Sequence, residues 1–441
     1  MRKFSIVFGF ILVFFFNSFL AAEDKVNVVP DRAHSQPLIT TDEEGNVYVL
    51  HYGDDEALYV IKNKGEVVAK LQREGSVGSF IWMGFPEGKP SIIWRPKVSS
   101  GAKFLYFQRA EDKSLKFGEE AVINNAKSAL LPIDVAWKDR RVYISWSDER
   151  QSPQNVYMNY STDGGRTFRK EDINMTPGYV SNMGTIVISD KGLYFFFIGR
   201  KAGEKTGKNI EGEGSKLYVR ASEDGIQWSE AMPVAGFENW SPGIMKGVVT
   251  HEGPLVFWAG IKGIWYAYID GDGKWQPRMI EKTKDMDVNR IEIKRARNGD
   301  MYMISSYKEK EQSTSKPSVY FFRSTDNGKI WSYPVRINHN TYDNTSARFP
   351  DLHVTEKGTI VAVWQDHRLI RGNIYMNYST DGGKTWLSED INLDDNPGKN
   401  NDVYPYITGY KDKVSVLIPR YKDDWVRGDL DLYLKEVRVH E

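Results

Sequence analysis

Short, largely apolar runs recur along the chain, and turn residues such as Gly, Asn and Asp separate them from polar segments. The clearest eight runs are 47–50, 91–94, 142–146, 193–197, 255–258, 301–304, 359–364 and 414–418. Helical periodicity is weak throughout, so the pattern predicts strands. The runs recur roughly every 45–60 residues, which is typical of a four-stranded propeller blade. We therefore predict an all-β fold, a single propeller of eight four-stranded antiparallel blades.

The last repeat, about residues 401–441, contains only three strand patterns, around Tyr406, Val416 and Leu432. A spare strand pattern lies at 25–29, near the start of the chain. We expect it to complete the final blade and close the ring, because closure removes sheet edges that invite aggregation. Seven blades is the alternative if the two weakest, N-terminal repeats are misread. No linker interrupts the period, so residues 23–441 are predicted to form one domain.

One turn sequence recurs with this period. It is clearest as Ser379-Thr-Asp381-Gly-Gly383-Lys-Thr-Trp386, and it returns around Asp163, around Asp326 and, one residue shorter, around Asp224. Two weaker copies, at Asp112 and Asp270, keep the acid and an aromatic residue. Glycine supplies the positive φ of a tight hairpin and Asp accepts backbone N–H bonds across it. The residues of this turn are therefore predicted to be structural.

The pattern Ser-x-Asp-x-Gly-x-x-Trp resembles the Asp-box, or bacterial neuraminidase repeat. The chain is accordingly similar to the sialidase-type β-propeller superfamily over nearly all of its length. That resemblance implies the same propeller fold and suggests glycan-related functions, including exo-sialidase activity. Asp-boxes also occur in propellers that are not sialidases.

Residues 1–22 have the features of a secretory signal peptide: Arg2 and Lys3, an apolar stretch, and a small-residue cleavage site at Ala21 and Ala22. We predict a secreted or periplasmic protein with no membrane insertion once the signal is removed. The chain has no cysteine, and its 59 basic and 59 acidic residues balance. No basic stripe favours nucleic acid as a partner. The histidines are scattered, so we predict neither a metal site nor a cofactor, and we expect a monomer.

In such a blade the first strands start, and the second strands end, on one face of the ring, whereas the recurrent turns lie on the other. The first face is the candidate site, because two long inserts, 200–216 and 307–317, also reach it. Arginine can hold a carboxylate with two parallel hydrogen bonds. The predicted ligand-binding residues on this face are Trp240, Asn182, Arg290, Arg150, Asp148 and Arg420.

The segment Ser346-Ala-Arg348-Phe-Pro350 resembles the Arg-Ile-Pro opening of sialidases. By that resemblance, Arg348 and Arg368 would grip a sugar carboxylate. Asp366 and Tyr404 complete the predicted catalytic set. Sialidase chemistry needs a tyrosine nucleophile assisted by a glutamate. Tyr404 has a suitable ring position, but no motif selects the set, although Glu238 and Glu292 lie near the predicted face.

A structural interpretation of Arg368 competes with this one. Trp364-Gln-Asp366-His-Arg368 recurs as Trp146-Ser-Asp148-Glu-Arg150, which favours a repeated acid–base pair at a loop neck. Three functions therefore stay open. The first is a propeller that binds a glycan or glycoprotein ligand without turnover, and the second is an exo-sialidase-type glycoside hydrolase acting on acidic sugars. The third is a scaffold module for cell-envelope assembly.

Overall fold

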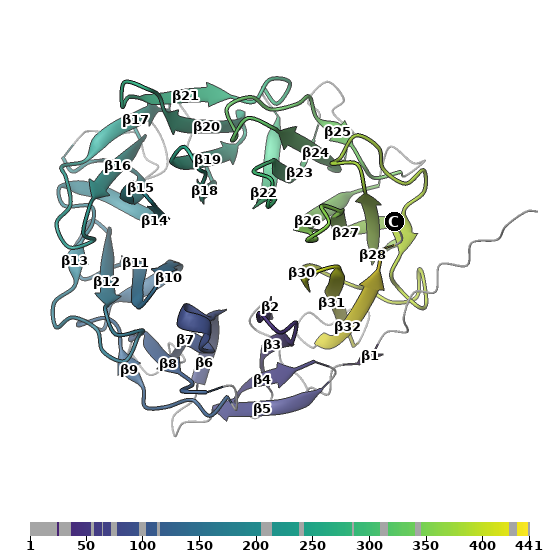
Figure 1. Cartoon of the computed structure of the whole chain (residues 1–441), viewed down its shortest axis with the longest axis horizontal. Helices are drawn as coiled ribbons and strands as arrows, with labels where there is room; N and C mark the ends of the chain where they lie inside the picture. The colour runs from purple at the N-terminus through teal and green to yellow at the C-terminus, as the bar shows by residue number, and fades with distance from the viewer. Residues whose placement is uncertain are drawn as a thin grey trace, which may run out of the picture.

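The computed structural model describes residues 24–25 and 37–439, apart from 54–56, 64, 72–76, 97–102, 113–114, 204–213, 238–241, 285, 309–315, 340–344 and 423–429. Its eight four-stranded antiparallel sheets stand around a common axis (Figure 1). The prediction of a single eight-bladed propeller is confirmed, and the seven-blade alternative is not needed. The signal peptide predicted at 1–22 lies outside the described residues, as do the central parts of both inserts.

The blades follow the chain, and each begins with its innermost strand. Blade 1 is β2 (Leu38–Thr41), β3 (Val47–Tyr52), β4 (Leu58–Lys62) and β5 (Glu66–Leu71). Blade 2 is β6 (Val77–Gly84), β7 (Ser91–Pro96), β8 (Tyr106–Arg109) and β9 (Ala121–Val122), with a 3-10 turn at Pro86–Gly88. Blade 3 is β10 (Ala129–Lys138), β11 (Arg141–Asp148), β12 (Asn155–Ser161) and β13 (Ile173–Asn174). Blade 4 is β14 (Tyr179–Ser189), β15 (Gly192–Lys201), β16 (Lys216–Ser222) and β17 (Met232–Gly236).

The second half of the ring repeats this order. Blade 5 is β18 (Ile244–Val249), β19 (Pro254–Gly260), β20 (Gly263–Ile269) and β21 (Trp275–Met279). Blade 6 is β22 (Asp287–Arg295), β23 (Met301–Lys308), β24 (Ser318–Ser324) and β25 (Val335–Arg336). Blade 7 is β26 (Ala347–Val354), β27 (Ile360–Leu369), β28 (Arg371–Ser379) and β29 (Ile391–Asn392). Blade 8 is β30 (Tyr406–Tyr410), β31 (Lys413–Tyr421), β32 (Leu430–Arg438) and β1 (Asp24–Lys25).

The eight apolar runs found in the sequence are the second strands of the eight blades, and their alternation builds the core. In β27, Ala362 and Trp364 pack toward blade 6, whereas Val361 and Val363 pack toward blade 8. Each of the eight buried clusters joins two neighbouring blades in this way. Because both sheet faces are buried, the second strands are apolar at nearly every position.

The ring closes between the two ends of the chain. β1 pairs antiparallel with β32, so the N-terminal strand supplies the fourth strand of the last blade as predicted. On the inner side, the hydroxyls of Thr41 and Thr408 lie 2.8 Å apart and join blades 1 and 8. An apolar cluster that includes Val49 and Leu417 fills the same junction. Residues 26–29 of the predicted closing strand lie outside the described part of the chain.

The recurrent Ser-x-Asp turns join the third and fourth strands of blades 3, 4, 6 and 7. In blade 7, the Ser379 hydroxyl donates to Asp381 (2.8 Å) and accepts the Gly383 N–H (2.8 Å). Asp381 also accepts the Thr385 N–H at 2.9 Å, and these hydrogen bonds hold the pKa of its carboxyl below the ordinary value. The turn rests on blade 6, where the Trp386 ring lies 5.0 Å from that of Phe321. The turns therefore lock each blade to the one before it.

Candidate functional site

The first strand of each blade starts, and the second strand ends, on one face of the ring, which we call the mouth face. Two groups of predicted site residues lie there. The first group comprises Arg150, Arg368 and Arg420, each with nearby acidic residues. The second comprises Arg290, Arg348 and Tyr404, which lie at the innermost strands of blades 6, 7 and 8.

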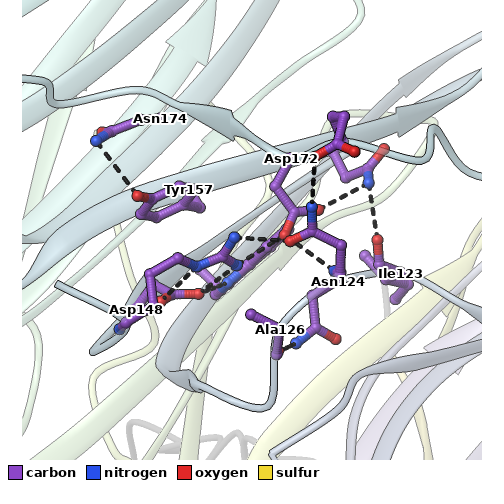
Figure 2. Close-up of polar contacts among 12 residues, drawn as sticks. Ile123, Asn124, Ala126, Asp148, Tyr157, Asp172 and Asn174 are labelled. Atoms are coloured by element: carbon purple, nitrogen blue, oxygen red, sulfur yellow. Dashed lines mark hydrogen bonds and ion pairs between the residues drawn. The ribbon is translucent and has the colours of Figure 1, made fainter.

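Arg150 lies in a closed network of charges. Its guanidinium donates to both oxygens of Asp148 (2.8 and 2.9 Å) and to Asp172 (2.7 Å). Its Cζ lies 4.0 Å from the centre of the Tyr157 ring. Figure 2 shows these contacts around Asp148 and Asp172. The two carboxylates have no solvent exposure, so the arginine neutralises charges that would otherwise be costly to bury.

The same network ties blade 3 to the loop that arrives from blade 2. Asp172 accepts the backbone N–H of Asn125 at 3.0 Å, and the Asn159 side chain donates to the Ile123 carbonyl at 2.8 Å. Arg150 donates to the Asn125 side chain as well, at 2.7 Å. We call this arrangement of arginine, tyrosine and two buried acids an inter-blade clamp.

Blade 7 contains a second clamp built in the same way. Arg368 donates to Asp366 (2.8 Å) and Asp390 (2.7 Å), and its Cζ lies 4.0 Å from the Tyr375 ring centre. Burial would lower the pKa of Arg368, but the hydrogen bonds to the two carboxylates outweigh it and hold the pKa above its ordinary value. The backbone N–H of His339, on the connection from blade 6, donates to Asp390 at 2.7 Å.

Blade 8 carries a third, more deeply buried clamp. Arg420 donates to Asp402 (2.6 Å) and Asp394 (3.1 Å) and lies 4.3 Å above the Tyr433 ring. The Lys435 ammonium donates to the Leu393 carbonyl at 2.8 Å, as Asn159 does to Ile123 in blade 3. In blade 8 a buried lysine therefore donates the hydrogen bond that Asn159 donates in blade 3 and Asn377 donates in blade 7.

The clamps account structurally for five of the predicted site residues: Asp148, Arg150, Asp366, Arg368 and Arg420. Carboxylates of the protein already occupy the donors with which Arg150 and Arg368 would grip a ligand. A ligand carboxylate would have to displace a buried aspartate, which would then remain unpaired. The catalytic and ligand-binding roles of these five residues remain predictions. Their geometry fits the structural interpretation, in which an acid and an arginine pair at the base of a loop.

The second group surrounds the axis of the ring between blades 6 and 8. Arg290 in β22 pairs with Glu292 at 3.2 Å, and Glu292 also meets Lys246 of blade 5 at 3.3 Å. Asp351 in β26 accepts the Ile407 N–H of β30 at 3.2 Å. Deep burial raises the pKa of this carboxyl. Charged side chains of neighbouring first strands thus meet across the blade boundaries.

Tyr406 lies among these charges. Burial raises the pKa of its phenol to about 12, with a smaller raising effect from Asp351 and an opposing effect from Arg290. Its hydroxyl oxygen is buried, and no side chain or backbone group of the described residues accepts or donates a hydrogen bond to it. A buried hydroxyl without a partner is costly, so its presence in an inner strand needs a functional or structural reason.

Two aromatic residues at the start of the inner strands carry backbone strain. Phe349, in a bulge of β26, has φ of 52°, and Tyr404, just before β30, has φ of 43°. Their rings meet edge to face with centres 4.4 Å apart. Positive φ is uncommon for bulky residues, and residues strained in this way cluster at active sites and ligand-binding sites. Arg348 precedes Phe349 and is exposed.

Of the other predicted residues, Asn182 does not join this group. Asn182 is exposed at a bulge of β14, in blade 4. Trp240 and Glu238 lie outside the described residues. The sequence-based prediction missed Asp351, Tyr406 and Phe349. The available signal was an acid in the inner strand, Asp351, directly after the Arg348-Phe-Pro motif.

Within the described residues, no three His, Asp or Glu side chains come together as metal ligands. The same part of the chain contains no helix long and apolar enough to cross a membrane.

No protein-family model and no curated protein matches the chain. Among solved structures, an ulvan lyase described as a new family of polysaccharide lyase matches with a TM-score of 0.50 and 12% identity over 96% of each chain. The NanB sialidase of Streptococcus pneumoniae matches with a TM-score of 0.40 and 11% identity, over 93% of this chain and 94% of the sialidase. An α-L-arabinofuranosidase of Fusarium graminearum matches with a TM-score of 0.45 and 11% identity, over 80% and 92% of the two chains. The likeness to the ulvan lyase shows a shared propeller fold.

Proposed function

We propose that this protein is a secreted propeller that binds an acidic glycan, free or on a glycoprotein, at the axis of its mouth face without turning it over. The observation that carries the proposal is the strained Phe349–Tyr404 pair beside Arg290 and the partnerless hydroxyl of Tyr406. These residues offer an aromatic surface, a cation and a hydrogen-bonding group within one small region.

Each part of this region suits a sugar that carries a carboxylate or sulfate. Aromatic side chains present flat apolar faces that cover the C–H faces of sugar rings. An arginine guanidinium matches a carboxylate or sulfate group in geometry and charge. Arg290 forms an ion pair with Glu292, which also meets Lys246, and the buried Asp351 is a second acid nearby. Arg348 is exposed on the same face, so a ligand can reach it without displacing a buried acid.

Similar proteins support this ligand class in general terms. The ulvan lyase of similar fold has also been solved bound to a glucuronate-containing saccharide. The recurrent Ser-x-Asp turns resemble the Asp-boxes of sialidase-type propellers. Fold likeness is an analogy and does not transfer an activity. The proposal therefore depends on the residues at the mouth face.

A sialidase-type hydrolase is the alternative, and the position of Tyr406 beside Arg290 favours it. That chemistry needs a tyrosine whose proton passes to a nearby carboxylate. The Tyr406 hydroxyl has no such hydrogen bond, and its pKa is raised, so it is a poorer nucleophile than an ordinary tyrosine. This is why we propose binding rather than hydrolysis.

The test is calorimetric titration of the purified protein with oligogalacturonate and sialyllactose, beside neutral lactose. We expect binding of an acidic sugar that falls at least tenfold in Arg290→Gln and in Arg348→Gln. Arg297→Gln is the matched control, because this arginine lies on the opposite face with its side chain 74% exposed. Equal affinity in all three variants, or binding of lactose alone, would contradict the proposal.

A fluorogenic sialoside distinguishes the alternative in the same samples. Release of the fluorophore by the wild-type protein, lost in Arg348→Gln and kept in Arg297→Gln, would establish hydrolysis. We expect no release above the background rate.

A further inference from the structure

A groove of about 670 Å³ lies on the outer rim of the ring, between blades 5 and 6. One wall is the end of β21 with the residues that follow it, including Arg278 and Glu281. The other wall is the Ser-x-Asp turn segment of blade 6, including Lys329, Ile330 and Tyr333. The fourth strands form the rim and the first strands surround the axis, so this groove is separate from the mouth-face site (Figure 1).

Blade 6 departs from the other full turns at this wall. In blades 3 and 7, the residue before the turn aromatic is a threonine, and its hydroxyl donates to the turn aspartate. Those bonds are 2.6 Å for Thr167 and 2.7 Å for Thr385. Ile330 occupies this position in blade 6, so the turn loses a hydrogen bond. It gains an isoleucine side chain that is 69% exposed.

A second departure lies three residues further on. Two residues beyond the turn aromatic, blade 3 has Lys170 and blade 7 has Ser388, but blade 6 has Tyr333. The Tyr333 side chain is 61% exposed. The fold therefore does not require an apolar residue at either position. Together they form an apolar surface that neither of the equivalent turns has.

Two cations flank this surface. The Lys282 ammonium lies 5.7 Å from the Tyr333 ring centre, and the Arg278 guanidinium lies 5.5 Å from that of Tyr268. Both side chains are exposed, and neither forms an ion pair within the described residues. A cation over an aromatic ring is stabilised by the ring and still keeps its outer side available to an anion.

The groove is held in shape by the blade beneath it. Trp331 points inward, with its ring 5.6 Å from that of Phe257, and its indole N–H donates to the Gly328 carbonyl. The turn is tied to blade 5 by the Asn327–Glu252 hydrogen bond, the Lys329–Glu252 ion pair and the bond from the Tyr266 hydroxyl to the Lys329 carbonyl. A fixed aromatic platform loses little entropy when a ligand binds.

We propose that this rim groove is a second, independent binding site, which takes a segment of an acidic polysaccharide. Sugar rings lie against Ile330 and Tyr333, and the carboxylate or sulfate groups of the polymer meet Arg278 and Lys282. A neutral surface patch would equally suit another protein, but the exposed cations Arg278 and Lys282 outnumber Glu281, the acid in the groove wall, and favour an anionic polymer. The inference does not rest on the function proposed for the mouth face.

The test is affinity electrophoresis of the protein in native gels that contain polygalacturonate, dextran sulfate or neutral dextran. Ile330→Thr/Tyr333→Ser gives blade 6 the residues of blade 7, and it restores the missing turn hydrogen bond. This variant is therefore expected to unfold at the wild-type temperature or above. We expect its retardation by the acidic polymers to weaken at least fivefold, and that of Arg278→Gln/Lys282→Gln to weaken similarly.

Arg297→Gln, which removes an exposed arginine away from both the groove and the mouth-face site, serves as the control variant. Its retardation should equal that of the wild-type protein. Retention by one acidic polymer but not the other identifies carboxylate or sulfate as the preferred group, and either result supports the proposal. Equal retardation of the groove variants and the wild-type protein, or equal retardation of the wild-type protein by neutral dextran, would overturn it.

Discussion

The guanidinium carbon of Arg368 lies 4.0 Å from the centre of the Tyr375 ring, and Arg150 lies at the same distance from Tyr157, four blades away. The two arginines also bind equivalent pairs of buried carboxylates. A sequence pattern that resembles a ligand-gripping arginine is thus repeated at a position where the same contacts hold two blades together. The distinction matters for function, because it changes what the loss of Arg368 should do.

Replacing Arg368 with alanine should destabilise the fold. The change leaves the fully buried Asp366 and Asp390 without their cation. Breaking a buried ion pair from one side typically costs about 3–5 kcal/mol. Urea unfolding of Arg368→Ala should show a loss in this range, whereas Arg297→Ala, which removes an exposed ion pair, should lose less than about 1 kcal/mol. A wild-type unfolding curve for Arg368→Ala would instead favour the ligand role predicted from the resemblance.

Replacing Gly383 with alanine should also destabilise the protein. Gly383 has φ of +84°, and an added Cβ would lie 2.1 Å from the Phe321 ring. Strain at positive φ and the steric clash should together cost about 2–4 kcal/mol. Gly178→Ala is the matched control, because Gly178 has φ of +79° with open space around it. If thermal melting shows equal losses in both variants, the packing of the turn on blade 6 contributes nothing.

The stability of the protein should fall in mild acid because of His51. This side chain is 2% exposed, and burial lowers its pKa from 6.5 to about 4. The unfolded chain binds a proton near pH 6.5 and the folded protein does not, so stability is complete above that pH. It is then lost as the pH falls toward 4, by about 3 kcal/mol in total.

The His51→Leu variant should remove this part of the pH dependence. Urea unfolding at pH 7 and pH 4.5 should give a smaller difference for the variant than for the wild-type protein. His251→Gln, at an exposed position, should keep the wild-type difference. A His51→Leu variant with the full wild-type difference would show that other groups account for the acid sensitivity.

The fold was predictable from sequence because every propeller blade repeats the same local pattern of apolar strands and turn residues. Apolar residues at nearly every position of 359–364 marked a doubly buried strand, and Asp381 with its glycines marked a turn. The site was harder to predict. Arg368 pairs with Asp390 from another part of its blade. The ring of Phe349 in blade 7 contacts that of Tyr404 at the start of blade 8. Periodicity gives the blade to which a residue belongs, but not the contacts that its side chain makes.

Replacing Tyr406 with phenylalanine should separate ligand binding from stability. The hydroxyl is buried without a partner in the described residues, so its removal relieves a desolvation cost and leaves the ring packing unchanged. The variant should be as stable as the wild-type protein or up to about 1 kcal/mol more stable. If the hydroxyl bonds to a bound acidic glycan, calorimetry should show affinity reduced about fivefold or more, because the ligand group then lacks its partner. Unchanged affinity together with raised stability would mean that the hydroxyl lies outside the binding site. The proposed ligand position would then shift from β30 toward Phe349 and Arg348.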